Sequence, residues 1–217
     1  MFRTSLQHLT RRIATAIAHY RRDSRGVAAI EFAMIVPIMS AMFIGAVELS
    51  QAITVDRRVT QVASSTADLV ARAEKQISHT EIGDIMKVGG YVLEPYSQTP
   101  LLITLRNVTS SPANATTTKQ SWSCTYKGLD KSQSCACSNT SKSIPPNLLT
   151  TNDSVVVAEV SYGYKPLIFD FFMQRAAGGS KSEAGAYTLT ETIYLKPRSQ
   201  AAMLMQENNT PCPMPTF

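Results

Sequence analysis

Histidine is scarce in this chain, with three in 217 residues, and two of them, His8 and His19, lie in the first 26 residues. No Ser-His-Asp arrangement can be drawn around the third, His79, and no nucleophile-elbow or phosphate-loop pattern occurs in the sequence. A histidine held beside a second catalytic group is the commonest general base. We therefore expect a protein that is not an enzyme, with no catalytic residues and no cofactor.

Paired carboxylates are the other arrangement that would indicate catalysis. Glu159, Asp170 and Glu191 are the acids to consider, but each stands alone, in or near a stretch that resembles a strand. Isolated acids of this kind usually lie on the surface. An anchored hydrolase that uses His79 as its base remains an alternative, which replacement of that residue would test.

A basic face for nucleic acid is also lacking, although the net charge is +5. The first 26 residues contain six of the 21 basic residues and one of the 16 acidic residues, so the rest of the chain is neutral. The high isoelectric point therefore belongs to a basic leader, and we expect no nucleic-acid partner.

What the sequence does contain is a long apolar run, Val27–Val47, which is interrupted by a single charge, Glu31. As a helix these 21 residues would extend roughly 30 Å, which matches the hydrocarbon core of a bilayer. The arginines upstream place residues 1–26 in the cytoplasm and the chain after about residue 48 outside. A cleaved secretory signal, with Ser50-Gln51-Ala52 as its cleavage site, is the competing interpretation.

The junction between leader and span reads Arg25-Gly26-Val27-Ala28-Ala29-Ile30-Glu31-Phe32. Gly26 offers an unhindered backbone to a protease at the membrane face. A carboxylate in mid-membrane costs about 2.5–3.5 kcal/mol on insertion scales. Cleavage after Gly26 would create an α-amine on Val27, and Glu31 of one subunit could pair with that amine on a neighbour. A snorkelling acid with no partner is the simpler alternative.

GVAAIEF followed by the apolar run resembles the TadE-like family, which comprises minor pilins or pseudopilins of bacterial Tad/Flp pilus systems. VDRRVTQVASSTADLVARA and several later segments extend the resemblance over roughly residues 21–200. The resemblance implies cleavage by a prepilin peptidase at Gly26 and Val27, with Glu31 and Phe32 completing the motif. It also implies a role in pilus assembly, and hence in adhesion and biofilm formation, with other pilus subunits as partners. The segment 107–143 and the tail after Arg198 do not match.

Beyond the span, apolar residues recur at threes and fours and predict that the helix continues as an amphipathic rod from 48 to about 78. Ser78 and Glu81 have the spacing of a capping box before a short helix over about 81–94, which Pro95 would end. The residues expected to form the apolar stripe are Leu49, Ile53, Val59, Val62, Leu69, Val70, Ala73 and Ile77.

Four stretches rich in β-branched and aromatic residues then predict strands. Because no long helix separates them, we expect an antiparallel sheet packed on the amphipathic helix. The fold class is therefore α+β, with a long N-terminal helix over 27–78 and a small pilin-like domain over 79–217. The predicted strands are Leu101–Val108, Trp122–Tyr126, Ser154–Tyr162 and Ala186–Leu195, with turns at SSPANATTTKQ, DKSQS, SIPPNLLTTND and RAAGGSKSEAG.

All four cysteines, Cys124, Cys135, Cys137 and Cys212, fall in the part expected outside the membrane. An even number there predicts disulfides in an oxidising periplasm. Three pairings are possible, and we expect Cys135 and Cys137 to take different partners. Zinc is the alternative, although the spacing lacks a second pair and a nearby histidine. A bridge to Cys212 would hold the PCPMPTF tail.

Together these patterns predict a bacterial inner-membrane protein with one span, a cytoplasmic N-terminus and a periplasmic domain. The preferred function is a minor pilin or assembly factor. An uncleaved anchored binding or scaffold protein is the alternative, and it predicts an intact leader and a silent E31A substitution.

Overall fold

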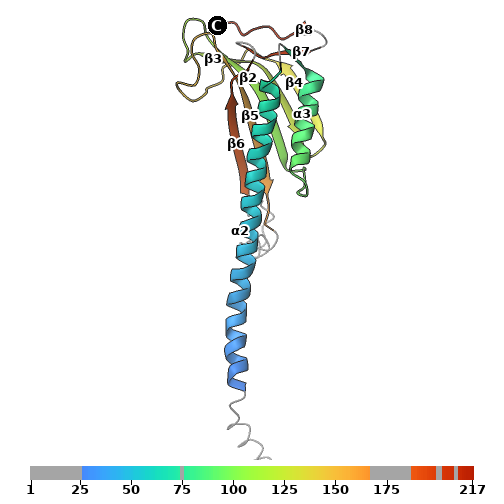
Figure 1. The fold of residues 1–217 in the computed structure, drawn as a ribbon, viewed down its shortest axis with the longest axis vertical. Coiled ribbons are helices and arrows are strands. Elements are labelled where there is room, and N and C mark those ends of the chain that lie inside the picture. The colour runs from blue at the N-terminus through green and yellow to red at the C-terminus, as the bar shows by residue number, and fades with distance from the viewer. Residues whose placement is uncertain (1–25, 74–75, 167–186, 199–201, 208–209) are drawn as a thin grey trace, which may run out of the picture. The chain divides into compact units, whose positions relative to one another are not determined.

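The computed structural model describes residues 26–73, 76–166, 187–198, 202–207 and 210–217 (Figure 1). The chain divides into two compact units, one ending at Val47 and the other running from Glu48 to Phe217. Helix α2, Val27–Ala71, crosses this division and contributes to both units. A mixed α+β fold with an antiparallel sheet follows the helix, as expected from the sequence.

The N-terminal part of α2 consists almost entirely of apolar side chains, and the helix continues through Pro37, which removes one backbone hydrogen bond and which spanning helices tolerate. Burial begins further along, in the second unit, where Val55, Val59, Val62 and Val70 are almost completely buried. Three residues expected in the apolar stripe instead face outward: the exposed fractions of Leu49, Ile53 and Leu69 are 63%, 47% and 43%. The buried stripe is thus rotated away from part of the predicted one.

Helix α2 ends at Ala71, so the predicted continuation to about residue 78 is wrong. Gln76–Ser78 forms strand β1 instead, and it pairs in parallel with Leu204–Glu207, strand β7. The pairing sets Ile77 opposite Met205, and both side chains are buried. Local periodicity gives no sign of this partner because it comes from the far C-terminal part of the chain.

Helix α3, His79–Val92, begins with the predicted capping box. The Ser78 hydroxyl accepts a hydrogen bond from the backbone N–H of Glu81, and a Glu81 carboxylate oxygen accepts one from the Ser78 N–H at 2.8 Å. The helix begins two residues before the expected start and ends with Leu93 as its C-cap. Pro95 follows shortly afterwards, as a helix stop requires.

The main sheet has five strands in the order β4-β3-β2-β5-β6, with every neighbouring pair antiparallel. The four predicted strands are present, and their bounds shift by a few residues. The fifth, β4, occupies most of the DKSQS stretch that we expected to be a turn. The strands are β2, Leu101–Ser110; β3, Thr118–Lys127; β4, Ser132–Cys137; β5, Ser154–Tyr164; and β6, Tyr187–Leu195.

The hydrophobic core of the second unit lies between this sheet and the helices α2 and α3. Val59 and Val62 of α2 share one cluster of buried residues with Met86 of α3 and with Ile103 and Leu105 of β2. The predicted packing of the amphipathic helix on an antiparallel sheet is therefore confirmed.

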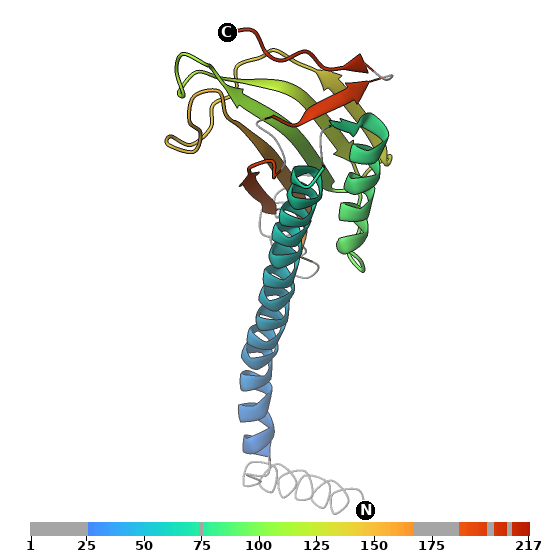
Figure 2. The ribbon, with the colours of Figure 1, turned by 45° about the horizontal axis from the view of Figure 1, so that its top comes forward.

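The C-terminal segment adds a second, smaller sheet in which β7 lies between β1 and β8, Thr210–Pro211. Met203 and Met205 are completely buried in the main core. The segment then runs back across the main sheet (Figure 2), where the carbonyl oxygen of Thr216 accepts a hydrogen bond from the Lys119 ammonium. The tail is thus an integral part of the fold.

Candidate functional site

The predicted processing motif lies at the start of the described chain. Gly26 is exposed, and Val27, the first residue of α2, has 53% of its surface exposed. A Cβ atom added to Gly26 would meet no other atom within 4 Å. The peptide bond between Gly26 and Val27 is therefore free of packing against other described parts of the chain.

Glu31 and Phe32 follow within the next turn and a half of the helix, and both are exposed. The exposed fraction of Phe32 is 70%. Among the described residues, none forms an ion pair or hydrogen bond with the Glu31 carboxylate. The motif thus presents an unpaired carboxylate and an aromatic ring on a helix surface that the described part of the chain leaves open.

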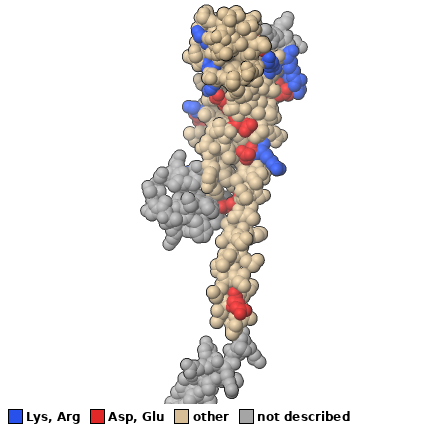
Figure 3. All heavy atoms as spheres, turned by 90° about the vertical axis from the view of Figure 1, so that its left-hand side faces the viewer, with Lys and Arg blue, Asp and Glu red and all other residues tan. Residues whose placement is uncertain are grey.

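The helix that carries the motif is the one described helix that is long and apolar enough to cross a membrane. None of its most apolar window is buried, whereas a core helix of a soluble protein would be mostly buried. Figure 3 shows lysine and arginine atoms gathered on the second unit, while the visible surface of the N-terminal part of the helix is uncharged apart from acidic atoms. These features favour a membrane anchor.

The four cysteines form two disulfides, Cys124–Cys135 and Cys137–Cys212. The expected separation of Cys135 and Cys137 is therefore correct, and a zinc site built from the cysteine thiolates is contradicted. Cys124 and Cys135 lie opposite each other in the β3–β4 ladder, so the first disulfide joins two neighbouring strands. The second ties the end of β4 to the tail, across 75 residues of sequence.

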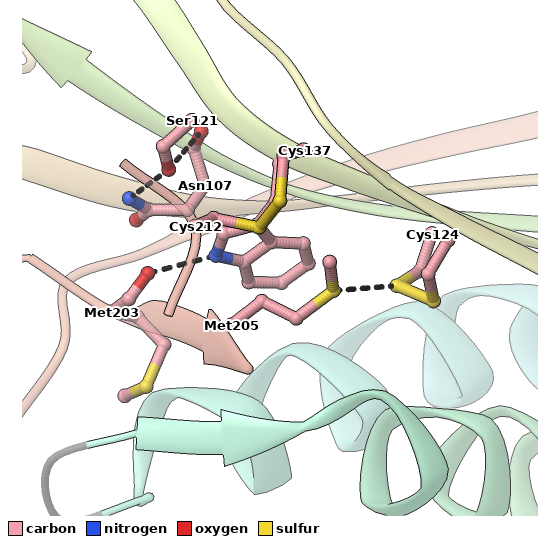
Figure 4. The surroundings of a disulfide bond; sticks show 9 residues. Asn107, Ser121, Cys124, Cys137, Met203, Met205 and Cys212 are labelled. Carbon is pink, nitrogen blue, oxygen red and sulfur yellow. Dashed lines mark hydrogen bonds between the residues drawn. A yellow bond between two sulfur atoms is a disulfide. The ribbon is translucent and has the colours of Figure 1, made fainter. Parts of the chain in front are cut away.

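Trp122 pairs in register with Cys137. The disulfide from Cys137 to Cys212 lies close to Met203 and Met205 (Figure 4). The indole N–H of Trp122 donates a 2.8 Å hydrogen bond to the carbonyl oxygen of Met203. Met205, two residues further on, places its sulfur 3.5 Å from the Cys124 sulfur. The sequence pointed to Cys212 as a possible anchor of the tail but gave no sign of the contacts made by Met203 and Met205.

The acids considered as paired carboxylates do not come together. Glu159 forms ion pairs with Arg106 and with Lys142, each at 2.7 Å, and Asp170 lies outside the described residues. Glu191 is opposite Val160 in the ladder, whereas Glu159 is opposite Thr192, so the two glutamates point to opposite faces of the sheet. The Glu159 cluster is a partly exposed contact of one acid with two cations.

His79 is the first residue of α3 and is half-buried beside the capping residue Ser78. The described residues contain no group of three histidine, cysteine or acidic side chains able to hold a metal ion. One open hollow lies between the α3–β2 connection and the β3–β4 turn, and the side chains around it include Glu94, Tyr96, Gln98 and Lys131. No histidine or cysteine is among the residues that line the hollow.

The comparison with protein families gives one match: the model of the TadE-like proteins matches residues 26–68. This confirms the resemblance drawn from the sequence over the motif, the apolar run and most of the amphipathic part of α2. The match begins at Gly26 and ends within α2, so the sheet and the tail lie beyond it. No curated protein and no solved structure matches the chain.

Proposed function

We propose that the protein is a minor pilin or pseudopilin that acts in assembly of a Tad/Flp-type pilus and that a prepilin peptidase cleaves it after Gly26. The observation that carries this proposal is the combination of the TadE-like match at residues 26–68 with an exposed Gly26 and an exposed Glu31 at the start of an apolar helix. The protein is membrane-anchored and acts as a substrate and a structural subunit.

The proposed topology has the basic leader in the cytoplasm and the second unit in the periplasm. Arginine-rich flanks stay on the cytoplasmic side of a span, and six arginines precede this one. Both disulfides lie in the second unit, and disulfides persist in oxidising compartments such as the periplasm. Charge and redox chemistry thus support the same orientation.

In the proposed assembly step, Glu31 forms a contact between neighbouring subunits. Cleavage frees the α-amine of Val27, and the carboxylate of Glu31 on one subunit pairs with that amine on a neighbour. A carboxylate and an ammonium that are each costly in lipid become a pair only when two helices lie in register. Exposed alanines in the span, such as Ala41 and Ala46, allow close approach of neighbouring helices.

The test is the N-terminal sequence and intact mass of the protein in membranes, from cells with and without the cognate prepilin peptidase. We expect a start at Val27 that depends on the peptidase. A start at Met1 under both conditions would overturn the processing step and favour an uncleaved anchored scaffold. A start near Ala52 would instead identify a secretory signal.

A matched pair of variants sharpens the test. Gly26 and Gly45 both have open space where a Cβ would stand, so a valine at either position disturbs no packing in the chain at that atom. Gly26→Val crowds the scissile bond and should block cleavage, whereas Gly45→Val should leave it intact. Loss of cleavage in both variants would point to a general defect of the span.

A further inference from the structure

The two disulfides differ in how far a reductant can reach them. Cys137 is exposed and is the last residue of β4, an edge strand of the main sheet. Cys124 is completely buried, and its partner Cys135 is half-buried in the ladder between β3 and β4. Exposed disulfides are the readily reduced ones, because a thiolate must reach a sulfur atom. The Cys137–Cys212 disulfide is therefore the one that a reductant reaches first.

The two sulfurs of this disulfide are not equally open to attack. Cys212 has 2% of its surface exposed and belongs to the main core cluster, whereas Cys137 lies at the surface. In thiol–disulfide exchange the attacking thiolate binds one sulfur and the other sulfur leaves. A protein dithiol in solution therefore attacks Cys137, and Cys212 is the leaving group.

The disulfide fixes one end of the segment that carries β7. The other end is fixed where the backbone N–H of Arg198 donates a 3.0 Å hydrogen bond to the Ala71 carbonyl oxygen. Between these points β7 makes three rungs with β1. A segment held at both ends gains little entropy when its contacts open, and a segment held at one end gains more. Reduction of the disulfide therefore favours release of the tail, defined here as the described residues from Met203 to Phe217.

The tail covers part of the core next to the second disulfide. The Met205 sulfur lies 3.5 Å from the Cys124 sulfur, and both side chains are completely buried (Figure 4). Trp122 belongs to the same cluster and donates its indole N–H to the Met203 carbonyl oxygen. Release of the tail thus uncovers Trp122 and opens a path to Cys124. The Cys124–Cys135 disulfide becomes reducible only after the tail has left.

We infer that the Cys137–Cys212 disulfide is a redox latch, which a protein dithiol opens to release the tail and uncover an apolar surface around Trp122. A thiolate of the dithiol attacks the Cys137 sulfur, the bond to Cys212 breaks, and the Cys212 thiolate takes up a proton. The second thiol of the reductant then displaces Cys137 from the mixed disulfide, and its proton passes to the Cys137 thiolate. Two thiols remain on this chain, and the reductant keeps the disulfide. A disulfide oxidant closes the latch by the reverse exchange.

The latch goes beyond the proposed function. It requires neither cleavage after Gly26 nor contact with other pilus subunits, and the proposed periplasmic placement determines only where the chain meets its reductant. Failure of the latch would therefore leave the proposed function untouched, and an uncleaved chain would still carry the latch.

The experiment uses the full chain in detergent micelles, treated with reduced thioredoxin as the protein dithiol. At intervals, free thiols are alkylated with N-ethylmaleimide, and mass spectrometry gives the labelled fraction of each cysteine. Limited proteolysis of the same samples follows release of the tail. In parallel samples reduced with dithiothreitol, acrylamide quenching follows Trp122, which is the single tryptophan and is completely buried. A thioredoxin variant without its second active-site cysteine traps the mixed disulfide and shows which sulfur it attacks.

We expect Cys137 and Cys212 to be labelled at least about tenfold faster than Cys124 and Cys135. Cleavage in the tail and quenching of Trp122 should rise together with this labelling. Reoxidation with oxidised glutathione should restore protection against both. The trapped thioredoxin should be found on Cys137, and its capture on Cys212 would contradict the inferred direction of attack.

Two variants test the order of the steps. In C124A/C135A, thioredoxin should release the tail as it does in the wild type, because the latch is present. In C137A/C212A the tail is released from the start, so the remaining disulfide should be reduced about tenfold faster than in the wild type. An unchanged reduction rate of Cys124–Cys135 in this variant would overturn the inferred shielding by the tail and its release on loss of the latch.

Three results in the wild-type chain would overturn the latch. Equal labelling of all four cysteines would mean that reduction follows unfolding of the whole unit. Labelling of Cys137 and Cys212 without new cleavage in the tail would mean that noncovalent contacts alone hold it. If these two cysteines stay unlabelled in the folded chain while a denatured sample is labelled in full, the disulfide is out of reach of a protein dithiol.

Discussion

Trp122 and Met203 hold the C-terminal tail against the main sheet through a 2.8 Å hydrogen bond between the indole N–H and the Met203 carbonyl oxygen. Both side chains are completely buried. Trp122 is also the register partner of Cys137, whose disulfide to Cys212 holds the tail a second time. One rung of the sheet thus carries both a covalent and a noncovalent attachment of the tail.

Removal of the Cys137–Cys212 disulfide should free the tail more than it unfolds the sheet. The double variant C137A/C212A opens a 75-residue loop. Because the unfolded chain then gains entropy, we expect the free energy of unfolding to fall by about 4 kcal/mol. We expect a lower urea midpoint, followed by Trp122 fluorescence in detergent, and rapid proteolytic trimming near Thr210.

The variant C124A/C135A is the control, since its disulfide closes only 11 residues within two paired strands. The same chain-entropy argument predicts that its free energy of unfolding falls by about 3 kcal/mol. We expect no proteolytic trimming of the tail in this variant. If the two variants released the tail at the same rate, the role assigned to Cys212 would be wrong.

Gly89 sets the spacing between α2 and α3. A Cβ at this position would lie 2.9 Å from the Cγ2 of Thr66 and 3.2 Å from the Cγ1 of Val62, both on α2. Overpacking of this kind costs about 1–3 kcal/mol, and the better helix propensity of alanine offsets about 1 kcal/mol of that. We expect Gly89→Ala to destabilise the fold by about 1 kcal/mol in urea unfolding.

A second substitution separates crowding from other effects of Gly89→Ala. Thr66→Ser removes the crowding methyl group and keeps the hydroxyl that donates to the Val62 carbonyl oxygen at 2.7 Å. The double variant should be more stable than the sum of the two single changes predicts. Strict additivity would mean that the two helices do not meet at this point.

The parts of the fold that the sequence predicted are those with local causes. The capping box at Ser78 and Glu81 depends on a spacing of three residues, and it forms as expected. The β-branched and aromatic residues of β2 and β5 likewise predicted these strands from their own sequence, and the structure adds that long runs of both strands are buried on both faces. The apolar run of α2 could be predicted from the sequence for the same reason.

The parts that the sequence did not predict depend on distant partners. Ile77 looked like one more position of the helical stripe, but its burial comes from pairing with Met205 in β7. Strand β4 has few apolar residues because it is an edge strand, and Gln133 therefore appeared to belong to a turn. The predicted processing motif differs from both groups. Gly26 and Glu31 can be recognised from the sequence, yet the partners that would give them their roles are other proteins.

Asp153 should make stability depend on pH in the acid range. Burial opposes its charge, but hydrogen bonds from Lys196 and from the Ser154 and Thr150 backbone N–H groups outweigh that effect and lower the pKa of Asp153. A carboxyl whose pKa is lower in the folded state stabilises the fold above its unfolded pKa, about 3.9, and loses that contribution as pH falls through its folded pKa.

We therefore expect Asp153→Asn to cost about 1–2 kcal/mol at pH 7, the range of a hydrogen-bonded, partly exposed charge. The difference in free energy of unfolding between wild type and Asp153→Asn should disappear as the pH falls below about 4. Urea midpoints measured across this range check the prediction, with Asp56→Asn, on the exposed surface of α2, as the control. If the difference in free energy of unfolding is as large at pH 2 as at pH 7, the variant is destabilised by altered packing and not by the lost charge.

Glu31→Gln tests the assembly step separately from processing. The amide has nearly the same shape as the carboxylate and is cheaper to place in lipid, so the variant should insert normally and be cleaved after Gly26 as the wild type is. It cannot form the ion pair with a neighbouring Val27 amine. We expect a marked loss of co-purification between differently tagged copies and partner subunits extracted from peptidase-containing membranes.

Glu94→Gln is the matched control because it makes the same change at an exposed acid in the second unit. It should leave co-purification unchanged. Because a lone snorkelling Glu31 would contribute nothing to contacts between subunits, normal co-purification of Glu31→Gln would favour that alternative. Loss of cleavage in Glu31→Gln would instead mean that the peptidase recognises the carboxylate. The defect in assembly would then result from the retained leader and not from a missing ion pair.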